Sequence, residues 1–485
     1  MTGHGSVTEA LEDIGVLHRA KRFSDALAAV ERSLARHPRE ARLWNARGVC
    51  LRSENRFDDA IDSYRTALDI SPHDAVIWSN LGNVLKDAKQ IRSSIVCHRH
   101  AVRLAPKTAD FHHNLGIALM SGGLPEDAVR AFDRALACSD RPKIRWDRAH
   151  AYLRLGDFRR GWPDYESRFS FGALPGRAAP GTKWTGQSYI GKRLLVLHEQ
   201  GFGDTLWAAR YFAQAKAYGG ELIVECRPEL ATLVRAMPSV DRVVVCGDTL
   251  PPAEYHCHVC SLPGLFTPDI LSIPGEPYLT VPMDGVPEIE ALAVPTPKLR
   301  VGIVWSGSTT FAGNGDRAVA LDAFLRAFAL PHVQLYSLQK GPPRAQLQER
   351  AGNVPVIDLA PHLNDFQDTA ALVSRLDLVI MTDTAVAHLC GALGRPVWLL
   401  LNFVPYWLWL ATGEDTPWYP SMRLFRQKSW NDWQGVFDAA SAELLALGLG
   451  SSSREDVADG STRPPHHRKC ITCIPASLHV AQQVL

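Results

Sequence analysis

The strongest constraint on this chain is a pattern of residues that returns every 34 positions through its first third. Three successive copies are complete. They are Ala41, Trp44, Gly48, Leu51, Ala60, Tyr64, Ala67 and Pro72; Ala75, Trp78, Gly82, Leu85, Ser94, His98, Ala101 and Pro106; and Ala109, His112, Gly116, Leu119, Ala128, Phe132, Ala135 and Asp140. Small residues let two antiparallel helices approach, large residues fill the space between them, and proline ends the second helix. The pattern predicts stacked helix pairs.

This spacing resembles the tetratricopeptide repeat. Degenerate copies flank the three complete ones, with Gly15, Ala26, Val30, Leu34 and Pro38 upstream and Ala149, Tyr152, Gly161 and Tyr165 downstream. We therefore predict an α-solenoid of four to five repeats over residues 7–168. The resemblance implies a concave face that binds a protein or peptide partner. The sequence leaves two roles open for the Trp and His side chains of the repeats, namely partner binding and packing.

Beyond the repeats, short apolar strands alternate with helical patterns. Residues 169–192 are rich in Gly, Pro and Ser, and we predict a linker there. Strands are predicted at 193–198, 221–225 and 240–245 in a first unit (193–285), and at 299–305, 334–338, 376–381 and 397–401 in a second unit (299–446). The alternation predicts an α/β region of two doubly wound, Rossmann-like domains with parallel sheets. Ligands of such sheets bind beyond the carboxyl ends of the strands.

Charge and composition exclude several classes of protein. The 52 Lys and Arg residues balance 51 Asp and Glu residues, which argues against a mainly electrostatic nucleic-acid binder. The ten cysteines are scattered, so we expect no disulfide framework. The most apolar stretch, 396–411, is shorter than the roughly 20 residues of a spanning helix, and the N-terminus shows no secretory signal. We therefore expect a cytoplasmic protein without a transmembrane segment, and a disordered tail over 450–485.

The first candidate site follows the strand at 376–381. Either Thr382 or Asp383 can cap the helix that begins there. The amides of residues 384–386 then face outward as an anion site, aided by the helix dipole. Thr384 and His388 share one helix face because they are four residues apart. A diphosphate would fit such a site, and the simpler alternative is a capped helix with a packed histidine.

The second candidate site is the loop Gly201-Phe202-Gly203-Asp204. Its two glycines permit a tight turn and the close approach of a ligand. Asp204 follows a strand, where a carboxylate is able to accept a proton from an attacking hydroxyl. The alternative is that Asp204 only caps the next helix. The loop lacks the third glycine of the dinucleotide-binding fingerprint, since position 206 is Leu.

Residues 183–430 resemble the heptosyltransferase-like glycosyltransferases (family 9), which have the two-domain GT-B fold. The resemblance rests on Gly201-Phe202-Gly203-Asp204-Thr205, on Val304-Trp305-Ser306-Gly307, and on Asp383-Thr384-Ala385-Val386-Ala387-His388-Leu389 with Gly391-Ala392-Leu393-Gly394 and Pro396-Val397 after it. Repeats followed by such a domain are similar to bacterial tetratricopeptide glycosyltransferase-like proteins.

The resemblance implies a role for each matching residue. Asp204 would be the catalytic base, with Gly201 and Gly203 in the acceptor-side loop. The donor and its phosphates would be bound by Thr309, Thr310, Arg317, Lys340, Asp383, Thr384, Ala385 and His388. Ala385 stands where true heptosyltransferases commonly have glycine, and Gln339 or Lys340 stands near where the family has an acidic contact to the nucleoside. These departures leave the donor sugar open.

The expected activity is the inverting transfer of a sugar from a nucleotide-diphosphate sugar to a protein or glycan acceptor. Helix amides, Arg317 and Lys340 would neutralise the leaving group without a metal, and no cofactor is expected. The repeats would recruit the acceptor or a partner. Two alternatives stay open: a non-catalytic scaffold with a degenerate transferase domain, and an enzyme like the protein O-linked N-acetylglucosamine transferases.

Two further groups of residues are expected to be structural. His256, Cys257, His258 and Cys260 lack a second ligand pair and also fit a buried strand, and Cys470 and Cys473 form a lone C-x-x-C, so we predict no metal site. The tryptophans of the second unit should pack around its carboxyl-terminal part; they are Trp407, Trp409, Trp418, Trp430 and Trp433.

Overall fold

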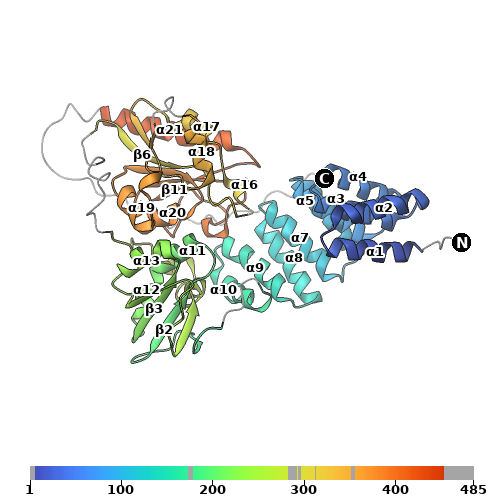
Figure 1. Ribbon diagram of the computed structural model, residues 1–485, viewed down its shortest axis with the longest axis horizontal. Coiled ribbons are helices and arrows are strands. Elements are labelled where there is room, and N and C mark those ends of the chain that lie inside the picture. The colour runs from blue at the N-terminus through green and yellow to red at the C-terminus, as the bar shows by residue number, and fades with distance from the viewer. Residues whose placement is uncertain are drawn as a thin grey trace, which may run out of the picture.

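The computed structural model describes residues 6–172, 178–281, 292, 296–311, 313–350 and 356–452. A helical array extends from the N-terminus, and two units with sheets lie at its other end, one above the other in the view of Figure 1. In the described part of the chain, no helix is both long and apolar enough to span a bilayer. Most of the predicted tail, from residue 453 onward, lies outside the described residues.

The helical array consists of five antiparallel pairs, which confirms the predicted repeats. The pairs are α1 (Val7–Arg19) with α2 (Phe23–Arg36), α3 (Ala41–Ser53) with α4 (Phe57–Ile70), α5 (Ala75–Asp87) with α6 (Ile91–Leu104), α7 (Ala109–Ser121) with α8 (Pro125–Cys138), and α9 (Pro142–Arg154) with α10 (Phe158–Tyr165). A 3-10 turn, η1 (Glu166–Ser170), follows the last pair.

Each complete repeat places a glycine of its first helix against a ring of its second helix. The pairs are Gly48 with Tyr64, Gly82 with His98, and Gly116 with Phe132. A β-carbon at Gly48 or Gly82 would come within 2.7 Å of the facing ring, closer than side chains tolerate. The glycine of the pattern is therefore required by the close packing of the two helices.

The Trp and His side chains of the pattern tie each repeat to the preceding one. Trp44 Nε1 donates to the carbonyl of Pro38 and Trp78 Nε1 to that of Pro72, both at 2.8 Å. The Nε2 atom of His112 lies 2.8 Å from the carbonyl oxygen of Pro106 and donates to it, since a carbonyl only accepts. A packing role for these side chains is thus established.

The first sheet has five described strands in the order β1-β5-β2-β3-β4, and every described pair is parallel, as predicted. The strands are β1 (Thr182–Lys183), β2 (Arg193–Leu197), β3 (Glu221–Cys226), β4 (Arg242–Val245) and β5 (Tyr255–His258). Its helices are α11 (Phe202–Ala208), α12 (Phe212–Lys216), α13 (Pro228–Arg235) and α14 (Leu262–Phe266).

Two predictions for this unit need correction. The supposed linker at 169–192 supplies the edge strand β1 and the fully buried side chains of Trp184 and Tyr189. The many Gly, Pro and Ser residues of this segment led to the linker prediction. The burial of Trp184 and Tyr189 was not predicted, because the residues that cover them lie elsewhere in the chain. The sequence also predicts a single helix over 206–218. The helix begins earlier, at Phe202, and a 3-10 turn at Ala209–Tyr211 divides it.

The second sheet has six described strands in the order β11-β10-β9-β6-β7-β8, again all parallel. They are β6 (Leu299–Val304), β7 (Val333–Ser337), β8 (Val356–Asp358), β9 (Leu378–Thr382), β10 (Val397–Leu401) and β11 (Met422–Arg426). Its helices are α16 (Asn314–Arg317), α17 (Leu321–Phe328), α18 (Ala345–Gln348), α19 (Phe366–Val373), α20 (Ala385–Ala392) and α21 (Trp433–Ser452). The edge strands β8 and β11 were not predicted.

One hydrophobic core joins the last repeat to both sheet units. Trp162 of α10 lies 6.4 Å from Trp207 of the first unit and 5.6 Å from Trp407 of the second, measured between ring centroids. Trp207 also contacts Trp418 at 5.2 Å. The α9–α10 pair is therefore part of the α/β core, and Figure 1 shows it beside the first unit.

Candidate functional site

The two predicted sites meet where α11 contacts α20. Each helix follows the carboxyl end of a central strand, β2 in one sheet and β9 in the other. A β-carbon at Gly203 would lie 2.8 Å from His388 Cδ2 and 3.7 Å from the α-carbon of Ala385. Gly203 is thus needed for the close approach of two helices. This contact brings Asp204 near the residues predicted to bind the donor.

Asp204 lies in the first turn of α11. Its Oδ2 accepts a hydrogen bond of 2.9 Å from the amide of Gly201, so the local capping role is real. Burial raises the pKa of Asp204 to about 6, and the charges of Glu199 and Asp383 act in the same direction. The residue nevertheless keeps some solvent exposure. A carboxylate with a pKa near neutrality suits a general base, so both predicted roles fit Asp204.

Asp383 and Thr384 lie at the N-terminus of α20 and are mostly buried. Thr384 is the N-cap residue, and no side chain caps the helix, so the prediction that Thr382 or Asp383 would do so is wrong. The Thr384 hydroxyl instead points to the sulfur of Met381, at 3.8 Å. The first-turn amides of α20, including that of Ala385, are thus without a side-chain cap, as an anion site requires.

A cation stands beside this helix end. Arg317 Nη1 lies 3.8 Å from Asp383 Oδ2. Burial raises the pKa of Asp383, and the Arg317 charge opposes that increase. The guanidinium also lies over the ring of Phe311, 4.6 Å from its centroid. Thr309 and Thr310 occupy the exposed turn between β6 and α16, on the same loop as Phe311.

His388 is buried one turn further along α20. Its Nδ1 lies 3.0 Å from the hydroxyl of Tyr419, and its ring stacks on Trp409 at a centroid distance of 5.3 Å. Burial lowers the pKa of His388 to about 3, so the ring is neutral at physiological pH. His388 therefore contributes no positive charge at this helix end.

Lys340 follows β7, and β6 lies between β7 and β9 in the sheet. Lys340 is therefore set apart from the N-terminus of α20, which follows β9. Its Nζ donates to the carbonyl of Leu363 and helps line a pocket with Arg344 and Gln348. The neighbouring Gln339 is buried, and its Oε1 accepts the amides of Trp305 and Ser306 at 3.0 and 2.9 Å. Gln339 is thus structural, whereas Lys340 faces a different part of the carboxyl edge from Asp383.

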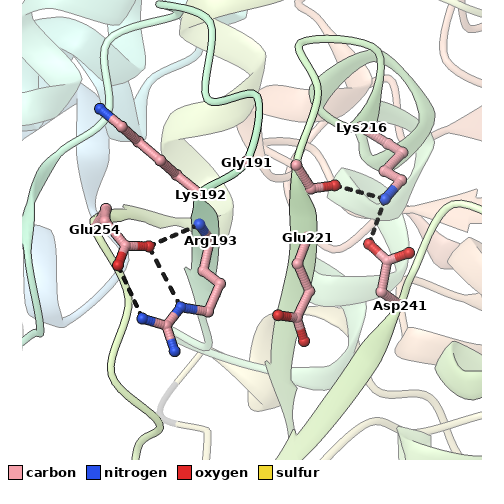
Figure 2. Close-up of a pocket in the computed structure, with 8 residues that line it drawn as sticks. Gly191, Lys192, Arg193, Lys216, Glu221, Asp241 and Glu254 are labelled. Atoms are coloured by element: carbon pink, nitrogen blue, oxygen red, sulfur yellow. Dashed lines mark hydrogen bonds and ion pairs between the residues drawn. The ribbon is translucent and has the colours of Figure 1, made fainter.

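The amino end of the first sheet carries a separate open pocket of about 560 Å³ (Figure 2). Four of its charged side chains form two ion pairs. Lys216 Nζ lies 2.5 Å from Asp241 Oδ2, and Arg193 lies 2.8 Å from Glu254. The pocket is at the opposite end of the strands from Asp204, so it is distinct from the candidate site.

The sequence-based prediction missed the side chains that hold the site in place. Tyr419 and Trp409 orient His388, and Arg210 donates to the carbonyl of Trp418 at 2.7 Å. Arg210 also lies over the ring of Tyr419, 4.6 Å from its centroid. The sequence analysis predicted that the tryptophans pack around the carboxyl-terminal part of the second unit, but it did not identify their partners. No pattern in the sequence around Arg210 indicated its role.

Within the described residues, no group of three or more His, Cys, Asp or Glu side chains is arranged to hold a metal ion. In the 256–260 segment, His256 Nδ1 lies 2.9 Å from the carbonyl of Pro180. Cys257 and Cys260 are buried in the core shared by the two units. This segment is structural in character.

Comparisons with known proteins support the repeats. A tetratricopeptide repeat family model matches residues 17–75. Protein FlbA of Caulobacter vibrioides is 29% identical over 362 residues, which cover 67% of this chain and 57% of that protein. The chain therefore matches little more than half the length of this relative.

Three solved structures are each similar over about a third of the chain. The pilF protein of Pseudomonas aeruginosa is 18% identical (TM-score 0.32), covering 34% of this chain and 76% of that one. TTC0263, a TPR protein of Thermus thermophilus, is 19% identical (TM-score 0.32; 35% and 92% covered). YrrB, a TPR protein with an unusual peptide-binding site, is 15% identical (TM-score 0.29; 35% and 87% covered). The described elements, together with the family match over 17–75, make the protein a tetratricopeptide-like helical repeat followed by a parallel-sheet α/β region.

Proposed function

We propose that the protein is a glycosyltransferase of the two-domain GT-B type, which moves a sugar from a nucleotide-diphosphate sugar to a hydroxyl of a protein or glycan. The observation that carries the proposal is the contact of α11 with α20. It puts a carboxylate suited to proton transfer beside an uncapped helix N-terminus, at the carboxyl ends of two parallel sheets.

In this mechanism the donor diphosphate lies at the N-terminus of α20. The amides of Ala385 and Val386 and the guanidinium of Arg317 stabilise the negative charge that develops on the leaving nucleoside diphosphate. Lys340 lies toward the nucleoside side of the donor. Thr309 and Thr310 contact the phosphates from their exposed turn. No metal ion is needed for this charge stabilisation.

Asp204 accepts the proton of the acceptor hydroxyl as that oxygen attacks the anomeric carbon. The new bond forms on the face opposite to the bond that breaks, so the anomeric configuration inverts. The raised pKa of Asp204 matches this task, because a base with a pKa near the working pH combines ionisation with useful basicity.

The solenoid recruits the acceptor or a partner protein. A row of polar contacts crosses the first helices of successive repeats and supports this role. Asn80 Nδ2 donates to Asn45 Oδ1 at 2.9 Å, and Asn114 Nδ2 donates to Ser79 Oγ at 3.1 Å. Such side chains offer hydrogen bonds to the backbone of a polypeptide, whatever its side chains are.

The test is a transfer assay of the full chain with a panel of nucleotide-diphosphate sugars and protein or glycan acceptors. Asp204→Asn should lower kcat by about 100-fold or more, since that is the usual contribution of a general base. Binding of the nucleoside diphosphate should persist in this variant. The control is Glu221→Gln, which changes a carboxylate at the amino end of the same sheet. Equal rates for Asp204→Asn and the parent would refute the assigned role of Asp204.

A second candidate is a non-catalytic scaffold. The observation that favours it is the burial of Asp383, Thr384 and His388, which are each less than one-tenth exposed and leave little surface for a donor to contact. A scaffold would show no thermal stabilisation by uridine, guanosine, cytidine or adenosine diphosphate, even far above a plausible Kd. A rise in Tm with one nucleotide favours the transferase. The sugar that is transferred then distinguishes an enzyme like the O-linked N-acetylglucosamine transferases from a hexosyl or heptosyl transferase.

A further inference from the structure

A buried ion pair joins the end of the solenoid to the first sheet. Arg168 of η1 is fully buried, and its Nε and Nη2 donate to the two oxygens of Glu199 at 3.1 and 3.0 Å. Glu199 follows β2 and is also buried. Such bidentate contacts are strong and hold a defined geometry. This ion pair thus adds a geometrically specific connection to the hydrophobic core that the helical repeat shares with the α/β region.

The surrounding groups satisfy this ion pair. Arg168 Nη1 donates to Glu166 Oε1 at 2.7 Å, and Lys183 Nζ lies 2.6 Å from Glu166 Oε2. Ser261 Oγ accepts from Arg168 at 2.7 Å and donates to Glu166 at 2.8 Å. Two cations therefore balance two carboxylates. Buried charges are tolerated when they are paired and hydrogen-bonded in this way.

The same ion pair anchors the loop that leads to Asp204. The residue after Glu199, Gln200, has a φ of 61°, a left-handed conformation that is costly for a side chain with a β-carbon. Gln200 Nε2 donates to the hydroxyl of Tyr165 at 3.1 Å. Its carbonyl accepts from Arg227 Nη2, also at 3.1 Å. The loop is thus held on one side by the solenoid and on the other by Arg227.

We infer that Arg168 and Glu199 are positioning residues, through which the last turn of the solenoid sets the location of the Asp204 carboxylate. The ion pair fixes Glu199 to Arg168. The backbone continues from Glu199 through Gln200 to Gly201, whose amide donates to Asp204 Oδ2. The role of Asp204 in transfer rests on the proposed function, whereas its placement by the ion pair does not. The solenoid is therefore a structural part of the site.

The pKa of Asp204 provides a second way to test this arrangement. The ionisable groups that act on Asp204 are Glu199, Asp383, Tyr406 and Cys260. Glu199 raises the pKa of Asp204, so Glu199→Gln should lower it. Removing the positive charge of Arg168 leaves Glu199 uncompensated, so Arg168→Met should raise the pKa of Asp204. A general loss of packing would not move the two variants in opposite directions.

The first experiment is hydrogen exchange of the full chain, followed by mass spectrometry. In Glu199→Gln, amides of residues 199–208 should exchange about tenfold faster or more, because a broken buried pair is strongly destabilising. Peptides of 378–392 should be unchanged. The matched control is Glu254→Gln, which removes an exposed ion pair with Arg193 at the other end of β2 and should leave the loop unchanged. Unaltered exchange of the loop in Glu199→Gln would overturn the inference.

The second experiment is the pH dependence of kcat/KM for sugar transfer. The acidic limb should move to lower pH in Glu199→Gln and to higher pH in Arg168→Met. The KM for the nucleotide sugar should not change, since the donor side lies on α20. Shifts in the same direction, or none, would contradict the inference. If no transfer is detected with any variant, the proposed function fails while the exchange experiment still decides the positioning role.

A double variant covers the case in which a single change prevents folding. Arg168→Met with Glu199→Leu replaces the ion pair by apolar side chains of similar size, which proteins often accept without loss of stability. This variant should melt cooperatively and still show faster exchange over 199–208. Wild-type exchange of the loop in the folded double variant would equally overturn the inference.

Discussion

Single residues account for much of what distinguishes one repeat from the next. His98 occupies the ring position held by Tyr64 and Phe132 in the neighbouring repeats. It is completely buried, and both of its ring nitrogens are without a hydrogen-bond partner. Burial lowers the pKa of His98 to about 4, and the charges of Lys86 and Arg52 act in the same direction. His98 is therefore a weak point of the solenoid core.

We predict that His98→Phe stabilises the protein by about 1–3 kcal/mol, the usual cost of an unsatisfied buried polar group. The gain should increase at low pH. Because the folded-state pKa of His98 lies below 6.5, the unfolded chain binds more protons between pH 6.5 and about 4, and wild-type stability falls as the pH decreases through this window. The Phe variant should lack this contribution. Denaturant unfolding at pH 7 and pH 5 measures both effects, and Tyr64→Phe serves as the control.

The pKa of Asp204 leads to a prediction for the proposed transfer. The carboxylate form is the active base, and its pKa is about 6. The kcat/KM should therefore rise with pH through about 6 and then level off. A pH series of initial rates tests this. A profile that is flat from pH 5 to 7 would argue against Asp204 as the base.

At the scale of elements, the turn inside each helix pair repeats its backbone geometry. Each turn has one residue with positive φ, and these residues are Lys21, Asn55, Lys89, Gly123 and Gly156. The last three turns also contact the second sheet unit. Lys89 Nζ lies 2.8 Å from Asp316, and Gly123 faces Phe403. The repeat therefore determines which edge of the solenoid packs against the α/β region.

We predict that Gly156→Ala destabilises the protein by about 1–2 kcal/mol or more, because its φ of 75° disfavours a β-carbon. A β-carbon there would also lie 2.5 Å from Ile270 Cδ1. In contrast, Lys21→Gly at the equivalent turn of the first repeat should be neutral or stabilising, since its φ is 58°. Thermal unfolding of both variants tests the comparison. A stable Gly156→Ala protein would show that this turn tolerates a side chain.

Strands and helices with strong local patterns were predicted well, and edge elements were not. The predicted strand at 397–401 coincides with β10, and the predicted strand at 299–305 is one residue longer than β6. In contrast, β1 has only two residues and β8 three, and each pairs with a single neighbour. Such short edge strands carry no periodic signal. Their conformation depends on the strand beside them.

For the whole molecule, the shared core predicts where the chain can be divided. A chain that starts at residue 140 keeps α9, α10 and η1, and we expect it to be soluble and to unfold cooperatively. A chain that starts at residue 178 loses Trp162, Tyr165 and Arg168 from the common core, and we expect it to aggregate or to melt without a cooperative transition. Solubility and differential scanning calorimetry compare the two. A cooperative transition of the shorter chain would contradict the shared core.

The amino-acid sequence by itself determined the period of the repeats, the alternation of strands and helices, and the two loops that carry Asp204 and Asp383. These features follow from local patterns of apolar, small and turn residues, which depend on neighbours within one or two turns of the chain. Tertiary structure alone decided that the two loops meet at Gly203, that Arg168 pairs with Glu199, and that the supposed linker is part of a sheet. Each of these contacts joins residues from different elements, so its energy depends on packing that no local pattern records.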